Sequence, residues 1–134
     1  GLVYAVERKP EAVALLHENR AKLGGYNVKI VEGAAPDALE ALPAPDCVFV
    51  GGSGGAMRRI LEIAKQKNHA VRVVVNAIAL ETLHETQAAL SALGYADVEV
   101  TQLSAARGKL VGPYTMMTAN HPVFILSGGG ADAE

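Results

Sequence analysis

The chain has 134 residues, of which 50% are hydrophobic and only 4% aromatic, and its formal net charge at pH 7 is −2. This length allows one domain with a substantial core, and the charge excludes a strong general attraction to nucleic acid or to an anionic membrane. The single cysteine, Cys47, has no internal disulfide partner, which favours a reducing compartment and a cytoplasmic location. No apolar run approaches the length of a membrane-spanning helix.

The first half of the chain alternates β-rich and helical segments. Strands are predicted at residues 2–6, 28–31 and 47–50, with a short segment, PDALEAL, before the third. A helix is predicted to begin at Pro10 and to end before Gly24, because Pro suits the first helical turn and Gly the position just past the last. Four apolar residues are predicted to share one face of this helix: Ala12, Leu15, Leu16 and Leu23.

The second half continues the alternation. The i, i+3, i+4, i+7 spacing of Met57, Ile60, Leu61 and Ala64 predicts a helix, and a further helix is predicted at residues 79–93. Residues 71–75 have the apolar β-branched composition of a strand buried on both faces. Strands at 98–103 and 123–126 have no helix between them, only a long segment interpreted as a loop. The pattern predicts a parallel sheet covered on both sides, with these two strands as an antiparallel hairpin at its edge.

The segment DCVFVGGSGGAMRRI, residues 46–60, places four glycines and one serine between a strand and a helix. Such a turn often cradles a phosphate. This one is not a P-loop, because no GK[ST] follows, and it is not GxGxxG, because the third glycine would fall at Met57. Asn76 also ends the next strand, where a dinucleotide site would need an acid. Three interpretations stay open: a phosphate cradle, which these departures disfavour, a tight turn in which Ser53 caps the helix, or a backbone floor for substrate and cofactor.

Ligands of open α/β sheets bind at the carboxyl ends of the strands, so the residues just after each strand are candidates. Glu7 follows the first strand, where an acid can accept hydrogen bonds from both ribose hydroxyls of a nucleotide. It is equally interpretable as a solvated acid near a helix start. Basic groups between the last two strands, Arg107 and Lys109, together with Tyr114, could pair with substrate carboxylates or belong to an ordinary solvated loop. The four histidines suggest no metal cluster.

Five segments carry a family resemblance: YAVERKPEAVALLHEN, VEGAAPDAL, VFVGGSGG, VVNAIALET and ARGKLVGPYTMMTANHPVFILSG. They resemble the decarboxylating precorrin-6B carbon-15 methyltransferases of cobalamin biosynthesis, which also occur as the C-terminal domain of precorrin-6Y methyltransferase. The likeness covers about residues 2–127. It implies a class I S-adenosylmethionine-dependent methyltransferase fold, which is Rossmann-like and ends in an antiparallel hairpin. It implies a methyltransferase domain over residues 1–128, followed by a disordered tail at 129–134.

The resemblance also implies the site. Seven residues would bind S-adenosyl-L-methionine, or its product S-adenosyl-L-homocysteine: Glu7, Arg8, Gly33, Ala34, Ala35, Gly51 and Gly52. Six would face a precorrin tetrapyrrole: Ser53, Gly54, Asn76, Arg107, Lys109 and Tyr114. The glycines would clear space where a large flat substrate meets the methyl donor. No catalytic residue and no metal ligand is assigned.

The implied chemistry is methyl transfer from a sulfonium to a ring carbon, with loss of carbon dioxide from an acetate side chain. The resemblance further implies a homo-oligomer, with a tetramer the expected size, and no nucleic-acid or membrane partner. The family's first strand and its Gly-rich loop would precede Gly1 and are missing from this chain. Two alternatives remain open, an NAD-binding Rossmann-like module and a non-catalytic fragment.

Overall fold

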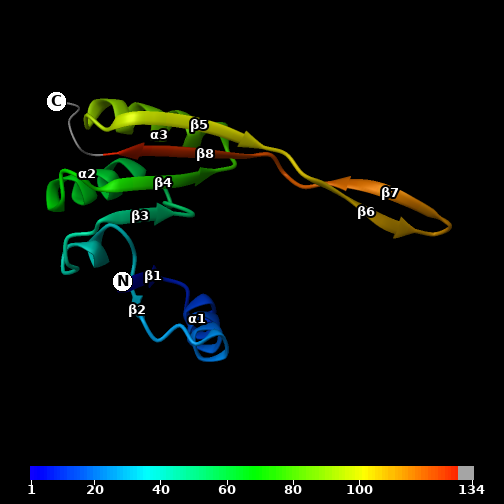
Figure 1. Ribbon diagram of the computed structural model, residues 1–134, viewed down its shortest axis with the longest axis horizontal. Helices are drawn as coiled ribbons and strands as arrows, with labels where there is room; N and C mark the ends of the chain where they lie inside the picture. The colour runs from blue at the N-terminus through cyan, green and yellow to red at the C-terminus, as the bar shows by residue number, and fades with distance from the viewer. Residues whose placement is uncertain (130–134) are drawn as a thin grey trace. The chain divides into compact units, whose positions relative to one another are not determined.

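The computed structural model describes residues 1–129, and all but the first residue of the tail expected at 129–134 lies outside the described residues. The chain forms two compact units, Gly1–Pro43 and Ala44–Glu134. Figure 1 shows the elements of both units. Among the described residues, the strands of the first unit pair only with each other, and the same holds for the second unit. No helix within residues 1–129 is long and apolar enough to cross a membrane.

The first unit is a strand–helix–strand motif followed by a short 3-10 helix. Its elements are β1 (Val3–Glu7), α1 (Pro10–Leu23), β2 (Val28–Glu32) and η1 (Asp37–Leu39). The two strands pair in parallel, so that Glu7 lies opposite Glu32 at their carboxyl ends. Helix α1 begins at a proline and ends at Gly24, which has the left-handed φ of 67° typical of a helix C-terminus, as predicted.

The predicted apolar face of α1 was wrong in part. Leu15 is 56% exposed and Leu23 is 83% exposed, whereas Val13, which was not assigned to that face, is buried. Within this unit the helix packs on a sheet of only two strands. So narrow a sheet covers a narrow strip of the helix, and the strip centres on Val13.

The second unit contains a mixed four-stranded sheet. Its elements are β3 (Cys47–Val50), α2 (Met57–Lys67), β4 (Arg72–Ala77), α3 (Leu80–Ala92), β5 (Ala96–Leu103), β6 (Ala106–Val111), β7 (Tyr114–Ala119) and β8 (Val123–Gly129). The strand order is β3-β4-β8-β5, in which β3 and β4 are parallel and β8 is antiparallel to both of its neighbours. The carboxyl ends of β3 and β4 therefore meet at one edge of the sheet.

The core of this unit lies between the sheet and α2 with α3. The predicted face of α2 is confirmed, since Met57, Ile60, Leu61 and Ala64 are all buried. One face of the sheet is covered, as the row formed by Val50, Val75 and Leu126 shows. The opposite face is more open: Val74 is half-buried and its neighbour Phe49 is 66% exposed. The prediction that β4 is buried on both faces is thus wrong for this unit, because its two helices pack against each other and share one face.

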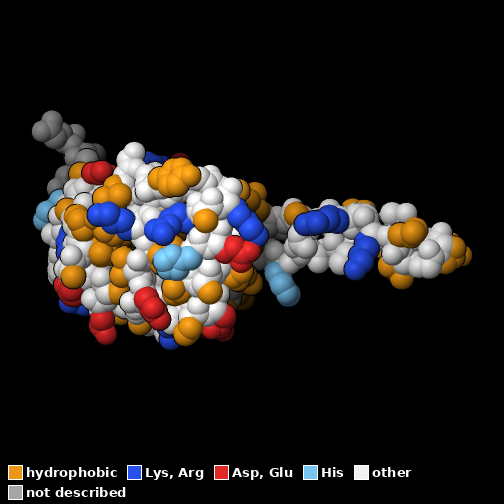
Figure 2. Space-filling view, turned by 90° about the horizontal axis from the view of Figure 1, so that it is seen from below, with side chains coloured by type: hydrophobic (Ala, Val, Ile, Leu, Met, Phe, Trp, Pro, Cys, Tyr) orange, Lys and Arg blue, Asp and Glu red, His pale blue; other side chains and the backbone are white. Residues whose placement is uncertain are grey.

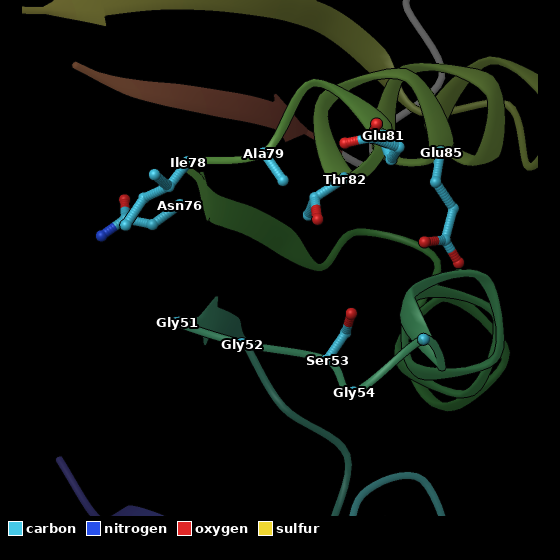
Figure 3. Close-up of a pocket in the computed structure, with 11 residues that line it drawn as sticks. Gly51, Gly52, Ser53, Gly54, Asn76, Ile78, Ala79, Glu81, Thr82 and Glu85 are labelled. Carbon is cyan, nitrogen blue, oxygen red and sulfur yellow. The ribbon is translucent and has the colours of Figure 1, made fainter. Parts of the chain in front are cut away.

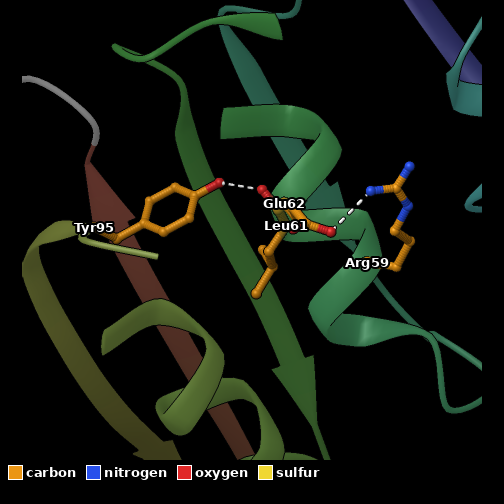
Figure 4. Close-up of polar contacts among 4 residues, drawn as sticks. All are labelled: Arg59, Leu61, Glu62 and Tyr95. Carbon is orange, nitrogen blue, oxygen red and sulfur yellow. Dashed lines mark hydrogen bonds and ion pairs between the residues drawn. The ribbon is translucent and has the colours of Figure 1, made fainter. Parts of the chain in front are cut away.

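A buried tyrosine ties the start of β5 to α2. The hydroxyl of Tyr95 donates a hydrogen bond of 2.8 Å to the carbonyl oxygen of Leu61 (Figure 4). Burial raises the pKa of Tyr95 to about 12. The ammonium of Lys65 lies 4.9 Å from the centre of the same ring and donates to the carbonyl oxygen of Gly94. The turn after α3 is therefore anchored to α2 by polar as well as apolar contacts.

The segment between β5 and β8 is not the loop that was expected. It forms an antiparallel hairpin, β6–β7, which extends beyond the four-stranded sheet from the end at which β3 and β4 finish (Figure 1). All twelve residues of the two strands are exposed. The sequence of this segment lacks the alternation of apolar and polar residues that indicates a half-buried strand, because neither face of the hairpin is covered within the described residues.

Candidate functional site

The loop after β3 has two kinds of glycine. Gly54 and Gly55 have φ values of 56° and 87°, the left-handed region that glycine adopts without strain. The turn itself therefore requires them. The Ser53 side chain does not cap α2, which begins after Ala56 without any side-chain cap; only the Ser53 carbonyl oxygen accepts a hydrogen bond, from the Ala56 amide. The capping interpretation of Ser53 is thus wrong.

Gly51 and Gly52 have no such conformational reason. Neither has a positive φ, and a Cβ atom built on Gly52 would meet no atom within 4 Å. A Cβ on Gly51 would make only an ordinary contact, 3.5 Å from the ring of Phe49. Neither the backbone nor the packing of this chain requires glycine at these two positions. Bare backbone there is suited to a ligand that lies against it.

A cavity of about 500 Å³ opens beside this loop, at the carboxyl ends of β3 and β4. Figure 3 shows the glycine loop on one side and the start of α3 on the other. Its lining consists of Gly51, Gly52, Ser53, Gly54, Gly55, Asn76, Ile78, Ala79, Glu81, Thr82 and Glu85. The structure thus brings together Gly51 to Gly54 and Asn76, five of the residues expected from the sequence.

The other wall of the cavity was missed. The Thr82 hydroxyl points from α3 toward the loop, and the Ser53 hydroxyl points from the loop toward α3 (Figure 3). The Glu85 carboxylate is also directed toward the loop side, and this residue is half-buried, whereas Glu81 is exposed. Ile78, which is 63% exposed, adds an apolar surface next to Asn76. The available signal was the segment VVNAIALET, which includes Ile78 and Thr82.

In the first unit, the Glu7 carboxylate is held in place by backbone. Its Oε1 atom accepts hydrogen bonds of 2.9 Å from the amides of Arg8 and Lys9. The Lys9 amide is the main cause that lowers the pKa of Glu7, with help from the Arg8 amide and from both positive side chains, against a smaller opposing effect of burial. Both bonds use one oxygen, and within residues 1–129 no hydrogen bond reaches Oε2. A ligand hydroxyl can therefore donate to a carboxylate that is already oriented.

The loop after β2 contains Gly33, Ala34 and Ala35. The Gly33 amide donates to the Glu7 carbonyl oxygen at 2.9 Å, which joins this loop to the end of β1. A Cβ at Gly33 would approach the Cβ of Ala38 to 3.1 Å, so close packing against η1 contributes to the need for glycine here. Ala34 is exposed, and its carbonyl oxygen accepts a hydrogen bond from the Ala38 amide. These contacts bring Glu7 and Gly33 together at one edge of the β1–β2 pair.

Arg107, Lys109 and Tyr114 lie on the β6–β7 hairpin and do not line the cavity. Residues directly opposite each other in an antiparallel pair share a face. Arg107 pairs with Thr118, Lys109 with Met116, and Val111 with Tyr114, so the two cations and the tyrosine share one face of the hairpin. Figure 2 shows basic side chains along the hairpin and apolar side chains toward its tip.

The sequence of residues 1–128 matches the family described as the precorrin methyltransferase domain. The chain belongs to this family. It is 43% identical over 129 residues to a probable cobalt-precorrin-6B C(15)-methyltransferase (decarboxylating) of Methanothermobacter thermautotrophicus, covering 95% of this chain and 67% of that protein. It is 33% identical to the cobalt-precorrin-6B C(15)-methyltransferase (decarboxylating) of Salmonella typhimurium, covering 93% of this chain and 65% of that protein. It therefore spans about two thirds of the length of these relatives.

Solved structures agree with the family. The precorrin-6Y C5,15-methyltransferase of Geobacter metallireducens is 35% identical with a TM-score of 0.88, covering 98% of this chain and 68% of that one. The precorrin-8W decarboxylase of Methanobacterium thermoautotrophicum is 42% identical with a TM-score of 0.87, covering 96% of this chain and 69% of that one. An S-adenosylmethionine-dependent O-methyltransferase of Thermotoga maritima, only 20% identical, shares the fold. The predicted methyltransferase fold class is confirmed, and the comparisons favour the methyltransferase over the NAD-binding alternative.

Proposed function

We propose that this protein transfers a methyl group from S-adenosyl-L-methionine to a ring carbon of a precorrin in cobalamin biosynthesis, with loss of a carboxylate as carbon dioxide. The observation that carries the proposal is the bare backbone of Gly51 and Gly52 at the edge of a cavity in a chain of this family. Backbone without protruding side chains leaves space where a large flat macrocycle meets the methionine end of the methyl donor. The relatives named above are described as cobalt-precorrin-6B C(15)-methyltransferases (decarboxylating).

The residues of each unit take separate roles in this proposal. In the first unit, Glu7 accepts hydrogen bonds from the ribose of the cofactor, with Arg8 beside it, and Gly33 to Ala35 border the adenine. In the second unit, Gly51 and Gly52 face the methionine end, while Ser53, Gly54 and Asn76 face the substrate. The sulfonium supplies an activated methyl group, and the protein's own residues contribute alignment and exclusion of water.

The hairpin face that bears Arg107, Lys109 and Tyr114 is proposed to contact the substrate's carboxylates. Arg and Lys form charge-assisted hydrogen bonds with carboxylates, which are about twice as strong as neutral ones. Because these side chains are exposed on the hairpin, they are free to turn toward a large anionic ligand. Their contribution is to affinity and orientation rather than to the chemical step.

The proposal is tested by incubating the protein with S-adenosyl-L-methionine and cobalt-precorrin-6B and measuring product mass and carbon dioxide. We expect a gain of one methyl group and a loss of one carboxyl group. Calorimetric titration with S-adenosyl-L-homocysteine, and in parallel with NAD, tests the cofactor separately. Binding of NAD in preference to S-adenosyl-L-homocysteine, or a folded protein that binds neither, would contradict the proposal.

The homo-oligomer is proposed to form through the other face of the hairpin. That face bears small and apolar residues without any charge: Ala106, Gly108, Leu110, Thr115, Met117 and Ala119. Leu110 is 72% exposed and Met117 69% exposed, and an isolated two-stranded hairpin is marginally stable in water. A second copy that covers this face would stabilise it, with a tetramer the expected size. Sedimentation of Met117→Lys should give a smaller species than sedimentation of Met116→Lys, whose side chain lies on the opposite face; equal sizes would exclude this interface.

A further inference from the structure

Decarboxylation makes a chemical demand that methyl transfer does not. When carbon dioxide leaves a carboxymethyl side chain, the carbon–carbon bond breaks and its electron pair remains on the methylene carbon. That carbon becomes a methyl group only when it gains one proton, and no oxidant or reductant is involved. A site that decarboxylates such a side chain therefore benefits from a positioned proton donor.

Within the described part of the chain, the ionisable side chains that line the cavity are Glu81 and Glu85. They differ in exposure and direction: Glu81 lies exposed in the first turn of α3, whereas Glu85 is half-buried, one turn further along, with its carboxylate directed toward the loop side (Figure 3). Two hydroxyls, those of Thr82 and Ser53, lie in the same gap. On the far side of the gap is the bare backbone of Gly52, which independently indicates where a ligand lies.

We propose that Glu85 is the proton donor to the carbon that loses carbon dioxide. This inference rests on the proposed function and adds a catalytic residue to it. The carboxylic acid of Glu85 gives its proton to the methylene carbon as the electron pair arrives there, and the resulting carboxylate regains a proton from solvent through the open side of the cavity. Methyl transfer from the sulfonium needs no proton from Glu85, so the two parts of the reaction depend on this residue differently.

The test compares Glu85→Gln with Glu99→Gln, a matched control at an exposed position on β5 that does not line the cavity. Methyl groups transferred and carbon dioxide released are measured in the same reaction. A positioned general acid typically contributes about 10²–10⁴-fold. In Glu85→Gln we expect carbon dioxide release to fall by about 100-fold or more, while methyl transfer continues and a methylated product that retains its carboxyl group accumulates. Glu99→Gln should keep the ratio of carbon dioxide released to methyl groups transferred that the wild-type protein shows.

Glu85→Asp is the second variant, because it keeps the acid and shortens the side chain by one methylene. It should release more carbon dioxide than Glu85→Gln. The proposal is overturned if Glu85→Gln retains the wild-type ratio, or if Glu99→Gln loses carbon dioxide release equally. It is also overturned if the Asp and Gln variants of Glu85 are both merely less stable with an unchanged ratio. Failure of the proposed function itself is distinguishable, since the wild-type protein would then transfer no methyl group at all.

Discussion

Tyr95 and Leu61 are joined by a 2.8 Å hydrogen bond from the tyrosine hydroxyl to a carbonyl oxygen inside α2. Both residues are buried. A hydrogen bond of this kind contributes about 0.5–1.5 kcal/mol to the free energy of unfolding. The contact joins the turn after α3 to α2, between two residues that are 34 positions apart in the chain.

Tyr95→Phe should lower the free energy of unfolding by about 1 kcal/mol at neutral pH. The folded-state pKa of Tyr95 is raised to about 12 by burial, so folding favours the neutral phenol. That stabilisation is complete below the unfolded pKa of about 10 and is lost as pH rises toward 12. Chemical denaturation at several pH values should therefore show the wild-type advantage over Tyr95→Phe shrinking from pH 10 upward. Tyr114→Phe, at an exposed position, is the control and should not change this slope.

Glu7→Gln should weaken binding of S-adenosyl-L-homocysteine by about tenfold or more, because a charged acceptor is replaced by a neutral amide. The pKa of Glu7 is lowered by its backbone partners, so the carboxylate persists through the neutral range and affinity should fall only when the pH drops through that lowered pKa. Titration calorimetry measures both effects. Glu32→Gln, at the opposite register position on β2, should bind as the wild-type protein does. Unchanged affinity of Glu7→Gln would remove the ribose role.

Gly52→Ala and Gly55→Ala should separate binding from stability. Gly52 has an ordinary φ and open space for a Cβ, so its alanine variant should unfold within about 0.5 kcal/mol of the wild-type protein. It should nevertheless lose substrate or cofactor affinity. Gly55, at a φ of 87°, should lose about 1–2 kcal/mol of stability as alanine. Thermal unfolding and ligand titration of both variants check this, and an unaffected Gly52→Ala enzyme would show that no ligand lies against that backbone.

Arg107→Gln and Lys109→Gln should each raise the KM for a polycarboxylate substrate by about tenfold, the worth of a hydrogen bond to a charged group. The turnover number should change less, because these side chains are proposed to orient the substrate only. The KM of the wild-type protein should also rise with salt more steeply than that of the double variant. Arg72→Gln, an exposed arginine at the start of β4, is the control. A loss of turnover without a change in KM would contradict an orienting role.

Much of the fold was predictable because its strong signals are local. The buried face of α2 follows from the spacing of Met57, Ile60 and Leu61, and several strands follow from β-branched runs. The exposed side chains of Leu15 and Leu23 on α1 were not predictable, since periodicity reports that a residue is apolar and not how wide its neighbouring sheet is. The β6–β7 hairpin was missed for a related reason. Its side chains alternate between two faces along each strand, but neither face is buried, so burial left no pattern in the sequence.

The part of the site that lies at the carboxyl ends of the parallel strands was predictable. Gly51 to Gly54 and Asn76 follow strand ends, and the parallel pairing of β3 with β4 brings them to one edge. Thr82 and Glu85 were not recognised as site residues, because both lie inside a helix and, in the segment VVNAIALET, only Asn76 was given a role. Their position depends on the angle at which α3 leaves the sheet, which no sequence spacing encodes. The separate reason for each glycine in GGSGG likewise required backbone dihedral angles.

The residues that stabilise the fold and the hairpin residues that are proposed to bind substrate are two separate sets. Arg107, Lys109 and Tyr114 lie on the hairpin face opposite the proposed subunit interface and outside the buried core, so substitutions at these three positions change the free energy of unfolding little. Selection for thermal stability would then tolerate changes at these three positions, whereas selection for the proposed methyl-transfer activity would not. A library of variants ranked by melting temperature alone would therefore not detect variants that have lost substrate binding at these positions. Only a screen for activity would detect them.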